Sequence, residues 1–393
     1  MMRLALLTLV AWPALAGAQK SVVLSKPDAE YAEPFSLITG VRALKDGRVL
    51  VSDSRERTVQ VIDFNGRAVK VGREGRGPGE YLTANAIAAL PGDSSALWDG
   101  GNHRYLTINA DGTVGREFRL EPPEGLGRAG YGAFATMLPR GVDARGNIYF
   151  QGSPFVTRAG VPAPADSVPV IRFDRARQRP ETVAFVRPAK GSATVTASAV
   201  GGVSISNGMA NPLLPLDEWA VLPDGRVAVV RGDEYRVDFY VARAVTTSGP
   251  PAPHENVSVD DAVKRMITEQ RKRQLSGASP RTGPSGQVSN VAPEILRQLL
   301  NLEPWPAYMP PFLRGAAIAR PMGAAGQIWV LRAKRREADP SVYDLFDGTG
   351  RVVARVQLPA KTLVAGFGSD AVYVLRTDED DLQYLQRYRL PAF

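Results

Sequence analysis

Three arginines occupy equivalent places in the chain and could bind an anion. Arg231, Arg332 and Arg376 each follow or end a hydrophobic segment that begins at a Gly or Asp in a turn. Arginine presents a fixed fork of N–H donors that matches the oxygens of carboxylate, sulfate and phosphate groups. If these positions meet at one mouth of a channel, the sequence predicts an anion-binding rim there.

A structural role for the same arginines is the alternative. Acidic residues follow them in the sequence, namely Asp233, Glu337 and Asp378. Ion pairs with these neighbours would use the guanidinium donors and only close the channel. Both interpretations stay open from the sequence.

Further candidate ligand residues are predicted on the same face. Asp53 and Asp99 end two earlier hydrophobic segments, and His103 follows Asp99 by four positions. Arg73 and Arg76 lie in a glycine-rich segment whose backbone N–H groups could form a nest for an anion. The glycines could instead serve only to permit positive φ angles where the chain crosses between repeats.

Aromatic residues beside prolines add a candidate stacking surface. Trp305 and Tyr308 lie in such a segment, and Tyr131 and Phe134 are predicted on the same face. These rings could stack on a sugar or a peptide. Alternatively, Trp305 and Tyr308 would hold a helical insertion against the rest of the protein.

Histidine- and cysteine-dependent chemistry has little support. The chain has two histidines and no cysteine, which disfavours histidine-rich zinc sites and Cys/His nucleophilic pairs. Asp53, Asp99 and Asn102 could offer oxygen ligands to calcium, although nearby arginines would oppose a cation. We therefore predict no catalytic residue and no cofactor, with calcium as the alternative, and we favour a binding protein over an enzyme.

One repeated pattern positions these residues. A turn and then a hydrophobic segment occur six times: Gly47–Asp53, Asp93–Asp99, Gly146–Gly152, Gly225–Arg231, Gly326–Arg332 and Asp370–Arg376. Such a repeat, with a second strand and turn after each copy, predicts an all-β fold, a six-bladed β-propeller. Because the strands of a blade alternate in direction, the second strands of all six blades should end on one face. We expect Ser21–Leu24 to complete the last blade and close the ring.

The predicted organisation has one folded domain behind a secretory signal. Residues 1–18 combine Arg3, an apolar run and a small-residue cleavage site, which predicts export to the periplasm or the medium. The propeller is predicted over 19–393, with a helical insertion at 258–312 between blades 4 and 5 that holds two helices. The segment from Ala189 to Asn211 is predicted as a surface hairpin.

The net charge of +8 favours an acidic partner. An anionic small molecule, a glycan and an envelope protein all fit this charge. The basic residues are scattered, and the one compact run, Arg271–Lys272–Arg273, lies on a predicted helix, so we expect no nucleic-acid partner. No segment after the signal is long enough to span a membrane, and we expect a monomer.

One segment carries a family resemblance. Gly72–Tyr81 reads GREGRGPGEY, and it resembles a family of exported bacterial six-bladed β-propeller proteins whose first blades often end in Gly-x-Gly-Pro-Gly-Glu-aromatic. The blade pattern also resembles NHL-repeat and gluconolactonase-like propellers. The resemblance implies the fold, whereas propellers host binding, lyase and hydrolase functions alike. The favoured hypothesis is ligand or protein binding without catalysis; a metal-dependent hydrolase or lactonase and a structural envelope protein are the alternatives.

Overall fold

The computed structural model describes most of the chain after residue 19. The described residues are 20–120, 138–158, 161–188, 194–197, 203–206, 211–276, 281–282, 288–289, 300–313 and 319–392. The predicted signal segment, Tyr131, Phe134 and nearly all of the second predicted helix lie outside these residues, so those expectations stay predictions.

Six antiparallel sheets form the blades of a β-propeller, as predicted. Blade 1 contains β3 (Ile38–Ala43), β4 (Val49–Asp53), β5 (Thr58–Ile62) and β6 (Ala68–Lys70). Blade 2 contains β9 (Ile87–Ala89), β10 (Ser95–Asp99), β11 (Arg104–Ile108) and β12 (Val114–Phe118). Blade 3 contains β13 (Gly141–Val142), β14 (Ile148–Gln151), β17 (Val168–Asp174) and β18 (Arg179–Val186).

The second half of the chain repeats this order. Blade 4 contains β21 (Glu218–Val221), β22 (Val227–Arg231), β23 (Arg236–Val241) and β24 (Ala244–Ser248). Blade 5 contains β27 (Met322–Ala324), β28 (Gln327–Leu331), β29 (Ser341–Phe346) and β30 (Val352–Leu358). Blade 6 contains β31 (Thr362–Phe367), β32 (Ala371–Thr377) and β33 (Gln383–Arg389).

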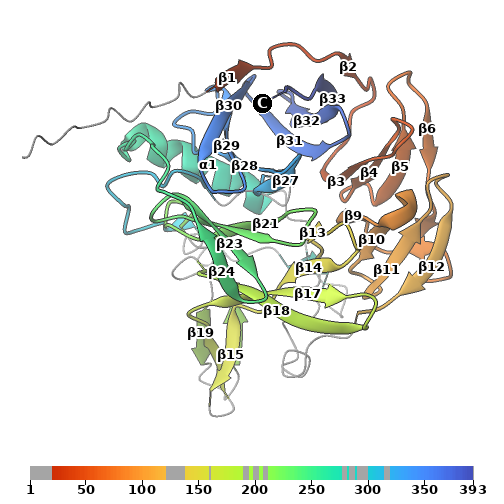
Figure 1. Ribbon diagram of the computed structural model, residues 1–393, viewed down its shortest axis with the longest axis horizontal. Helices are drawn as coiled ribbons and strands as arrows, with labels where there is room; N and C mark the ends of the chain where they lie inside the picture. Colours follow the sequence, from red (N-terminus) through yellow and green to blue (C-terminus); the bar gives the residue numbers. More distant parts are fainter. Residues whose placement is uncertain are drawn as a thin grey trace, which may run out of the picture.

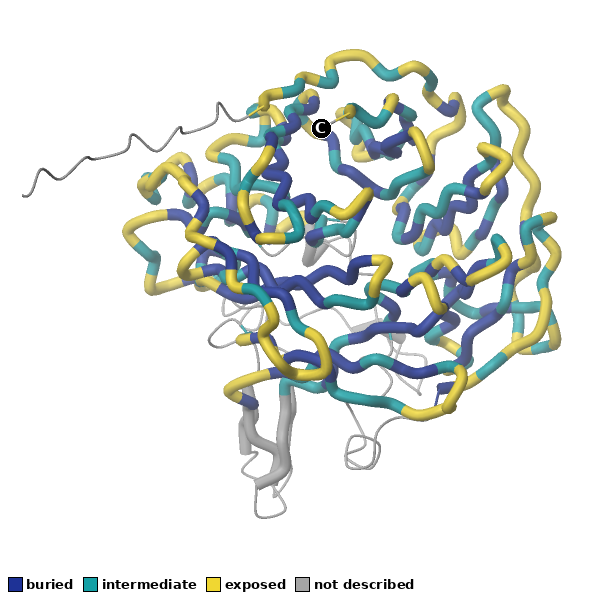
Figure 2. The backbone as a smooth tube through the Cα atoms, in the orientation of Figure 1, coloured by how far each residue is buried: buried dark blue, intermediate teal, exposed yellow. Residues whose placement is uncertain are grey.

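The first strand of each blade lies at the centre of the ring (Figure 1). There β3 packs beside β9 and β31, and β21 packs beside β13 and β27. Both faces of a blade are buried against its neighbours, which explains why the second strands are almost continuously hydrophobic. In β4, for example, Val49 and Val51 pack toward blade 6 while Leu50 packs toward blade 2. Figure 2 shows buried residues along these second strands.

The N-terminal segment closes the ring, but through different residues from those predicted. The fourth strand of blade 6 is β2 (Ala29–Glu30), which pairs antiparallel with β33. The prediction that Ser21–Leu24 fills this place is wrong, because β1 (Lys20–Val23) pairs in parallel with β30 of blade 5. Val22 and Leu24 pack against the hydrophobic cluster that blades 5 and 6 share. The hydrophobic alternation of Ser21–Leu24 fits the edge of β30 as well as the edge of β33, so it did not predict which of the two it would join.

The insertion between blades 4 and 5 contains α1 (Asp261–Ser276). The Asp260 carboxylate caps this helix by accepting the N–H group of Val263 at 3.0 Å. Val263 and Ile267 are buried in a cluster with Leu213. No helix among the described residues is long and apolar enough to cross a membrane.

Two hairpins extend from blade 3 and its connection to blade 4. The predicted surface hairpin is confirmed: β19 (Thr194–Ala197) pairs antiparallel with β20 (Val203–Ser206). A second hairpin joins β15 (Phe155–Arg158) to β16 (Val161–Pro164), and β16 lies beside β19. Both hairpins project away from the ring (Figure 1).

Candidate functional site

Arg231 lies within a carboxylate network at the end of β22. Its Nη1 contacts Asp217 at 2.6 Å and its Nε contacts Asp238 at 2.7 Å, while its Nη2 donates to the Tyr240 hydroxyl. Asp217 and Asp238 are both buried. Arg187 joins the network through Asp217 at 3.1 Å. The guanidinium group therefore already has anionic partners from its own blade and the preceding connection.

The equivalent place in blade 5 is organised around Asp344. This carboxylate is fully buried, and it accepts hydrogen bonds from Arg355 Nε at 2.9 Å and from the Tyr235 hydroxyl at 2.6 Å. Arg332 Nε lies 3.8 Å away. Burial, reinforced by the charge of Asp344, raises the pKa of Tyr235 well above its usual value. The phenol therefore stays protonated and donates a hydrogen bond to Asp344.

In blade 6 the carboxylate comes from the closing strand. Arg376 contacts Glu30 of β2 at 3.0 Å, and its guanidinium group lies 4.3 Å from the centre of the Tyr384 ring. The hydrogen bond from Arg376 lowers the pKa of Glu30. The segment that closes the ring therefore also neutralises the third arginine.

The acids predicted as partners of these arginines have other contacts. Asp233 pairs with Arg187 at 2.7 Å, Glu337 pairs with Arg273 of α1, and Asp378 accepts the backbone N–H group of Leu382 at 2.9 Å. Pairing with carboxylates, the structural alternative, is what the structure shows, although with different carboxylates. A ligand-binding role for the three arginines stays a prediction.

Asp53 and Asp99 accept hydrogen bonds from backbone N–H groups of nearby connections. Asp53 accepts the backbone N–H groups of Ser36 at 2.6 Å and of Glu56 at 3.0 Å. Asp99 accepts the N–H group of Thr83 at 3.1 Å. Both side chains are buried. Each carboxylate therefore ties the end of its second strand to the connection that enters the same blade.

These residues do not fit a calcium site. The amide nitrogen of Asn102 donates to the Gly75 carbonyl at 3.1 Å and to Asp99 at 2.6 Å, so a donor rather than an oxygen ligand faces Asp99. The oxygens of Asp53 and Asp99 already accept N–H groups. Within the described ranges, no three His, Asp or Glu side chains form a group that could hold a metal ion.

The predicted anion nest in the glycine-rich segment contains a carboxylate of the same segment. Glu80 Oε2 accepts the backbone N–H group of Gly77 at 2.8 Å, and Glu80 Oε1 contacts Arg73 at 2.7 Å. A Cβ atom on Gly75 would lie 2.0 Å from Glu80 Oε2. The Tyr81 hydroxyl donates to the Val71 carbonyl at 3.0 Å. The groups that could have bound an anion thus bind Glu80 of the same segment, at the crossing from blade 1 to blade 2.

The remaining predicted residues that the structure describes have contacts in different parts of the fold. The Arg76 carbonyl faces the Arg104 guanidinium group at 3.5 Å, and His103 is an exposed turn residue with a φ of 52°. Trp305 packs against the α1 cluster, as the structural interpretation expected. Tyr308 is 55% exposed, and its backbone bridges to Ser258 at the start of the insertion.

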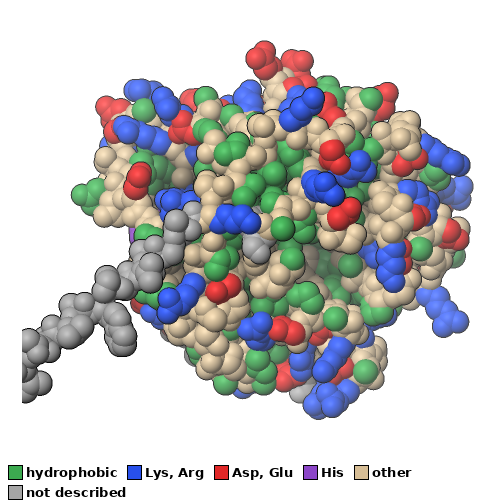
Figure 3. All heavy atoms as spheres, turned by 45° about the horizontal axis from the view of Figure 1, so that its top comes forward, with side chains coloured by type: hydrophobic (Ala, Val, Ile, Leu, Met, Phe, Trp, Pro, Cys, Tyr) green, Lys and Arg blue, Asp and Glu red, His purple; other side chains and the backbone are tan. Residues whose placement is uncertain are grey.

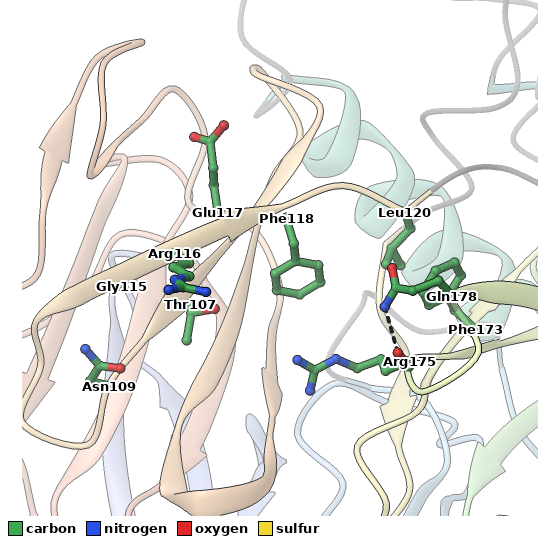
Figure 4. Close-up of a pocket in the computed structure, with 10 residues that line it drawn as sticks. All are labelled: Thr107, Asn109, Gly115, Arg116, Glu117, Phe118, Leu120, Phe173, Arg175 and Gln178. Atoms are coloured by element: carbon green, nitrogen blue, oxygen red, sulfur yellow. Dashed lines mark hydrogen bonds between the residues drawn. The ribbon is translucent and has the colours of Figure 1, made fainter.

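Sequence analysis missed a groove between blades 2 and 3 (Figure 4). It has a volume of about 550 Å³. The lining residues come from β11, β12, β17 and the connections that follow these strands: Thr107, Asn109, Gly115, Arg116, Glu117, Phe118, Leu120, Phe173, Arg175 and Gln178. Apolar and cationic side chains thus line one groove.

The apolar part of this groove is packed against other buried side chains. The Phe118 ring stacks on Tyr105, with the ring centres 5.0 Å apart and the planes at 7°. Leu120 and Phe173 are buried in the cluster that blades 2 and 3 share. Figure 4 shows the Phe118 ring and the Arg175 side chain pointing toward each other, and the guanidinium carbon lies 5.5 Å from the ring centre.

The cationic part differs from the arginines at the strand ends. Arg116 and Arg175 form no ion pair with any carboxylate in the described part of the chain. The acidic residue among those that line the groove, Glu117, pairs with Arg104, and Asp174, next to Arg175 in the chain, pairs with Arg177 at 3.0 Å. The N–H donors of these two guanidinium groups, which lie beside an apolar wall, can therefore bind solvent or a ligand.

The groove had little signal in the sequence because its two walls lie far apart along the chain. Arg116 and Phe118 alternate with Glu117 on an outer strand, which is an ordinary pattern for a half-exposed strand. Arg175 lies in a turn that reads as a simple charged loop. Only packing of blade 3 against blade 2 brings these groups together.

Proteins similar to this one were found among solved structures. The sequence matches no protein-family model and no curated protein. A gluconolactonase from Xanthomonas campestris is 13% identical, with 91% of each chain covered and a TM-score of 0.40. Virginiamycin B lyase from Staphylococcus aureus is 10% identical, with 89% of this chain and 95% of that chain covered and a TM-score of 0.37.

A third similar structure is regucalcin from Agrobacterium tumefaciens, a calcium-binding protein. It is 15% identical, with 93% of this chain and 95% of that chain covered and a TM-score of 0.36. The likeness is too distant to assign an activity, and the six-bladed architecture rests on the six sheets of this protein.

Proposed function

We propose that this protein is an exported binding module without catalytic activity, and that its ligand joins an anionic group to an apolar body. The binding site is the groove between blades 2 and 3. The observation that supports this proposal is the placement of Arg116 and Arg175 beside Phe118 without a carboxylate partner among the described residues. Arg231, Arg332 and Arg376, in contrast, each lie beside a carboxylate.

The proposed ligand follows from what each wall can bind. A hydrogen bond from a charged donor contributes roughly 1.5–3 kcal/mol, and it is strongest toward carboxylate, sulfate or phosphate oxygens. The apolar side chains that line the groove, Phe118, Leu120 and Phe173, favour an apolar body, since each buried CH₂ contributes about 0.8 kcal/mol. Figure 3 shows acidic and basic side chains interspersed over the face in view. We therefore expect a discrete anionic ligand rather than nucleic acid.

The proposal can be tested with dodecyl sulfate and anilinonaphthalene sulfonate, two anionic amphiphiles. We expect saturable binding, and we expect Arg175→Gln and Arg116→Gln each to weaken it by about tenfold, the equivalent of 1.4 kcal/mol. Arg67→Gln is the matched control because Arg67 is an exposed arginine in a turn of blade 1. Equal affinity in all four proteins, or an equal loss in the control, would contradict the proposal.

The metal-dependent hydrolase is the less supported alternative. It requires a cation near Asp53 and Asp99, and their oxygens would first have to release the backbone N–H groups that they accept. Stoichiometric calcium in the purified protein, lost together with activity on a lactone in Asp99→Asn, would support this alternative over the binding module.

A further inference from the structure

We infer that the open edge of β12 binds an extended peptide that carries an acidic side chain, so that the peptide becomes an additional strand of blade 2. This inference rests on the proposed function because the peptide would occupy the same groove. Four of the five residues of β12, Gly115–Phe118, line that groove. In the described part of the chain, β12 is the last strand of its sheet, with β11 on one side and no strand on the other.

The protein itself shows that the outer edges of its blades accept added strands. β1 lies along β30 in parallel, with Lys20–Val23 opposite Ala354–Gln357. β2 lies along β33 in the antiparallel direction, with Glu30 opposite Gln386. Both additions are short and arrive from a distant part of the chain. Backbone hydrogen bonds at a blade edge are therefore sufficient, together with a few side chains, to hold an extended segment.

The two blades beside the groove have β12 of blade 2 and β18 of blade 3 as their outer strands. The free edge of β18 is less accessible than that of β12. The backbone N–H group of Arg243, in the turn between β23 and β24, donates to the Val183 carbonyl of β18 at 2.9 Å. The Arg243 side chain also donates to the Thr182 carbonyl at 3.2 Å. Blade 4 thus covers part of this edge with its own turn, whereas Gly115, Arg116 and Glu117 of β12 are exposed.

The side chains next to the β12 edge specify the charge and the pattern of the peptide. Arg116 and Phe118 are two residues apart, so they lie on the same face of the strand. An added strand would present its own side chains to this face with the same period of two. An acidic residue next to Arg116, with an apolar residue two positions along next to Phe118, matches both side chains. The predicted ligand is therefore an acidic-x-apolar segment in extended conformation.

The test uses a fluorescein-labelled peptide of alternating glutamate and leucine, with the full-length protein. We expect saturable binding by fluorescence anisotropy, and slower hydrogen exchange at the β12 amides when the peptide is bound. Two control peptides separate the contributions. Lysine in place of glutamate should remove binding through charge, and N-methylation of alternate backbone nitrogens should weaken binding by at least about tenfold through loss of the strand hydrogen bonds.

The outcomes distinguish this inference from the proposed function. If dodecyl sulfate binds but the glutamate–leucine peptide does not, the peptide inference is overturned and the proposed groove stands. If neither binds, both are overturned. Equal affinity of the N-methylated peptide, or exchange protection on another blade, would also overturn strand addition at β12. Arg116→Glu should lower peptide affinity by about tenfold or more, while Arg67→Glu should leave it unchanged.

Discussion

Tyr235 of blade 4 donates its phenolic hydrogen to Asp344 of blade 5, with 2.6 Å between the two oxygens. Both side chains are fully buried, and 109 positions separate them in the chain. Arg355 supplies a second donor to the same carboxylate at 2.9 Å. The interface between these blades thus depends on a buried polar contact as well as on hydrophobic packing.

Replacing Tyr235 by Phe should therefore destabilise the ring. The substitution keeps the ring packing but removes one donor from a buried carboxylate, which costs about 1–3 kcal/mol. Urea unfolding followed by circular dichroism would measure the loss. Tyr308→Phe is the control, since Tyr308 is 55% exposed and its replacement should change the free energy of unfolding by less than about 0.5 kcal/mol. Equal stability of the two variants would show that Asp344 does not need the phenol.

Arg231→Gln and Arg376→Gln should differ strongly in stability. Arg231 is paired with the buried carboxylates of Asp217 and Asp238, so its loss should cost about 3 kcal/mol. The pair of Arg376 with Glu30 is one-third exposed on both sides, and its loss should cost less than about 1 kcal/mol. The free energies of unfolding in urea would test this difference. A stable Arg231→Gln protein that loses affinity for an anion would instead support ligand binding at the strand end.

The ion pair of the closing strand should make stability depend on pH. The hydrogen bond from Arg376 lowers the pKa of Glu30 in the folded protein. A lowered pKa means that the charged carboxylate stabilises the fold above the pKa of the unfolded chain, and that this stabilisation disappears as the pH falls through the lowered pKa. Wild type should therefore exceed Glu30→Gln in stability at about pH 7 but not at about pH 2.

Thermal unfolding of both proteins across this range would measure the effect. Glu33→Gln is the matched control, because Glu33 is an exposed carboxylate three residues away. A stability difference between wild type and Glu30→Gln that stays constant with pH would contradict the assignment.

The glycine-rich crossing predicts a coupled pair of substitutions. Gly75→Ala places a Cβ atom 2.0 Å from the Glu80 carboxylate, so the carboxylate must leave the Gly77 N–H group. We expect a loss of about 1–3 kcal/mol for Gly75→Ala alone. In a Glu80→Ala background the same change should cost less, because the clashing atoms are absent. Additive losses in a double-mutant cycle measured by urea unfolding would show that the two residues act separately.

The sequence determined the architecture because its signals are local. Each blade has its own turn and its own hydrophobic segment, and each segment needs only its neighbours in the chain to form a hairpin. The motif from Gly72 to Tyr81 is local in the same sense, since Glu80 contacts Gly77 and Arg73 within a few positions. Six copies of such units imply a ring without knowledge of any contact between blades.

The register of one hairpin could also have identified a partner of Arg231. This residue lies opposite Arg236, and Val229 lies opposite Asp238. Because side chains alternate along a strand, Arg231 and Asp238 share a face, whereas Asp233 lies in the turn. Counting along the hairpin would have favoured Asp238 over the nearer acid.

The tertiary structure alone decided which distant groups meet. The choice between the edges of blades 5 and 6 for the N-terminal segment, the contact of Tyr235 with Asp344, and the groove shared by Phe118 and Arg175 all join separate blades. Contacts between blades depend on how each twisted sheet is rotated against the next. No local pattern encodes that rotation, so a sequence can specify every blade while the groove between two blades forms only when the blades are packed.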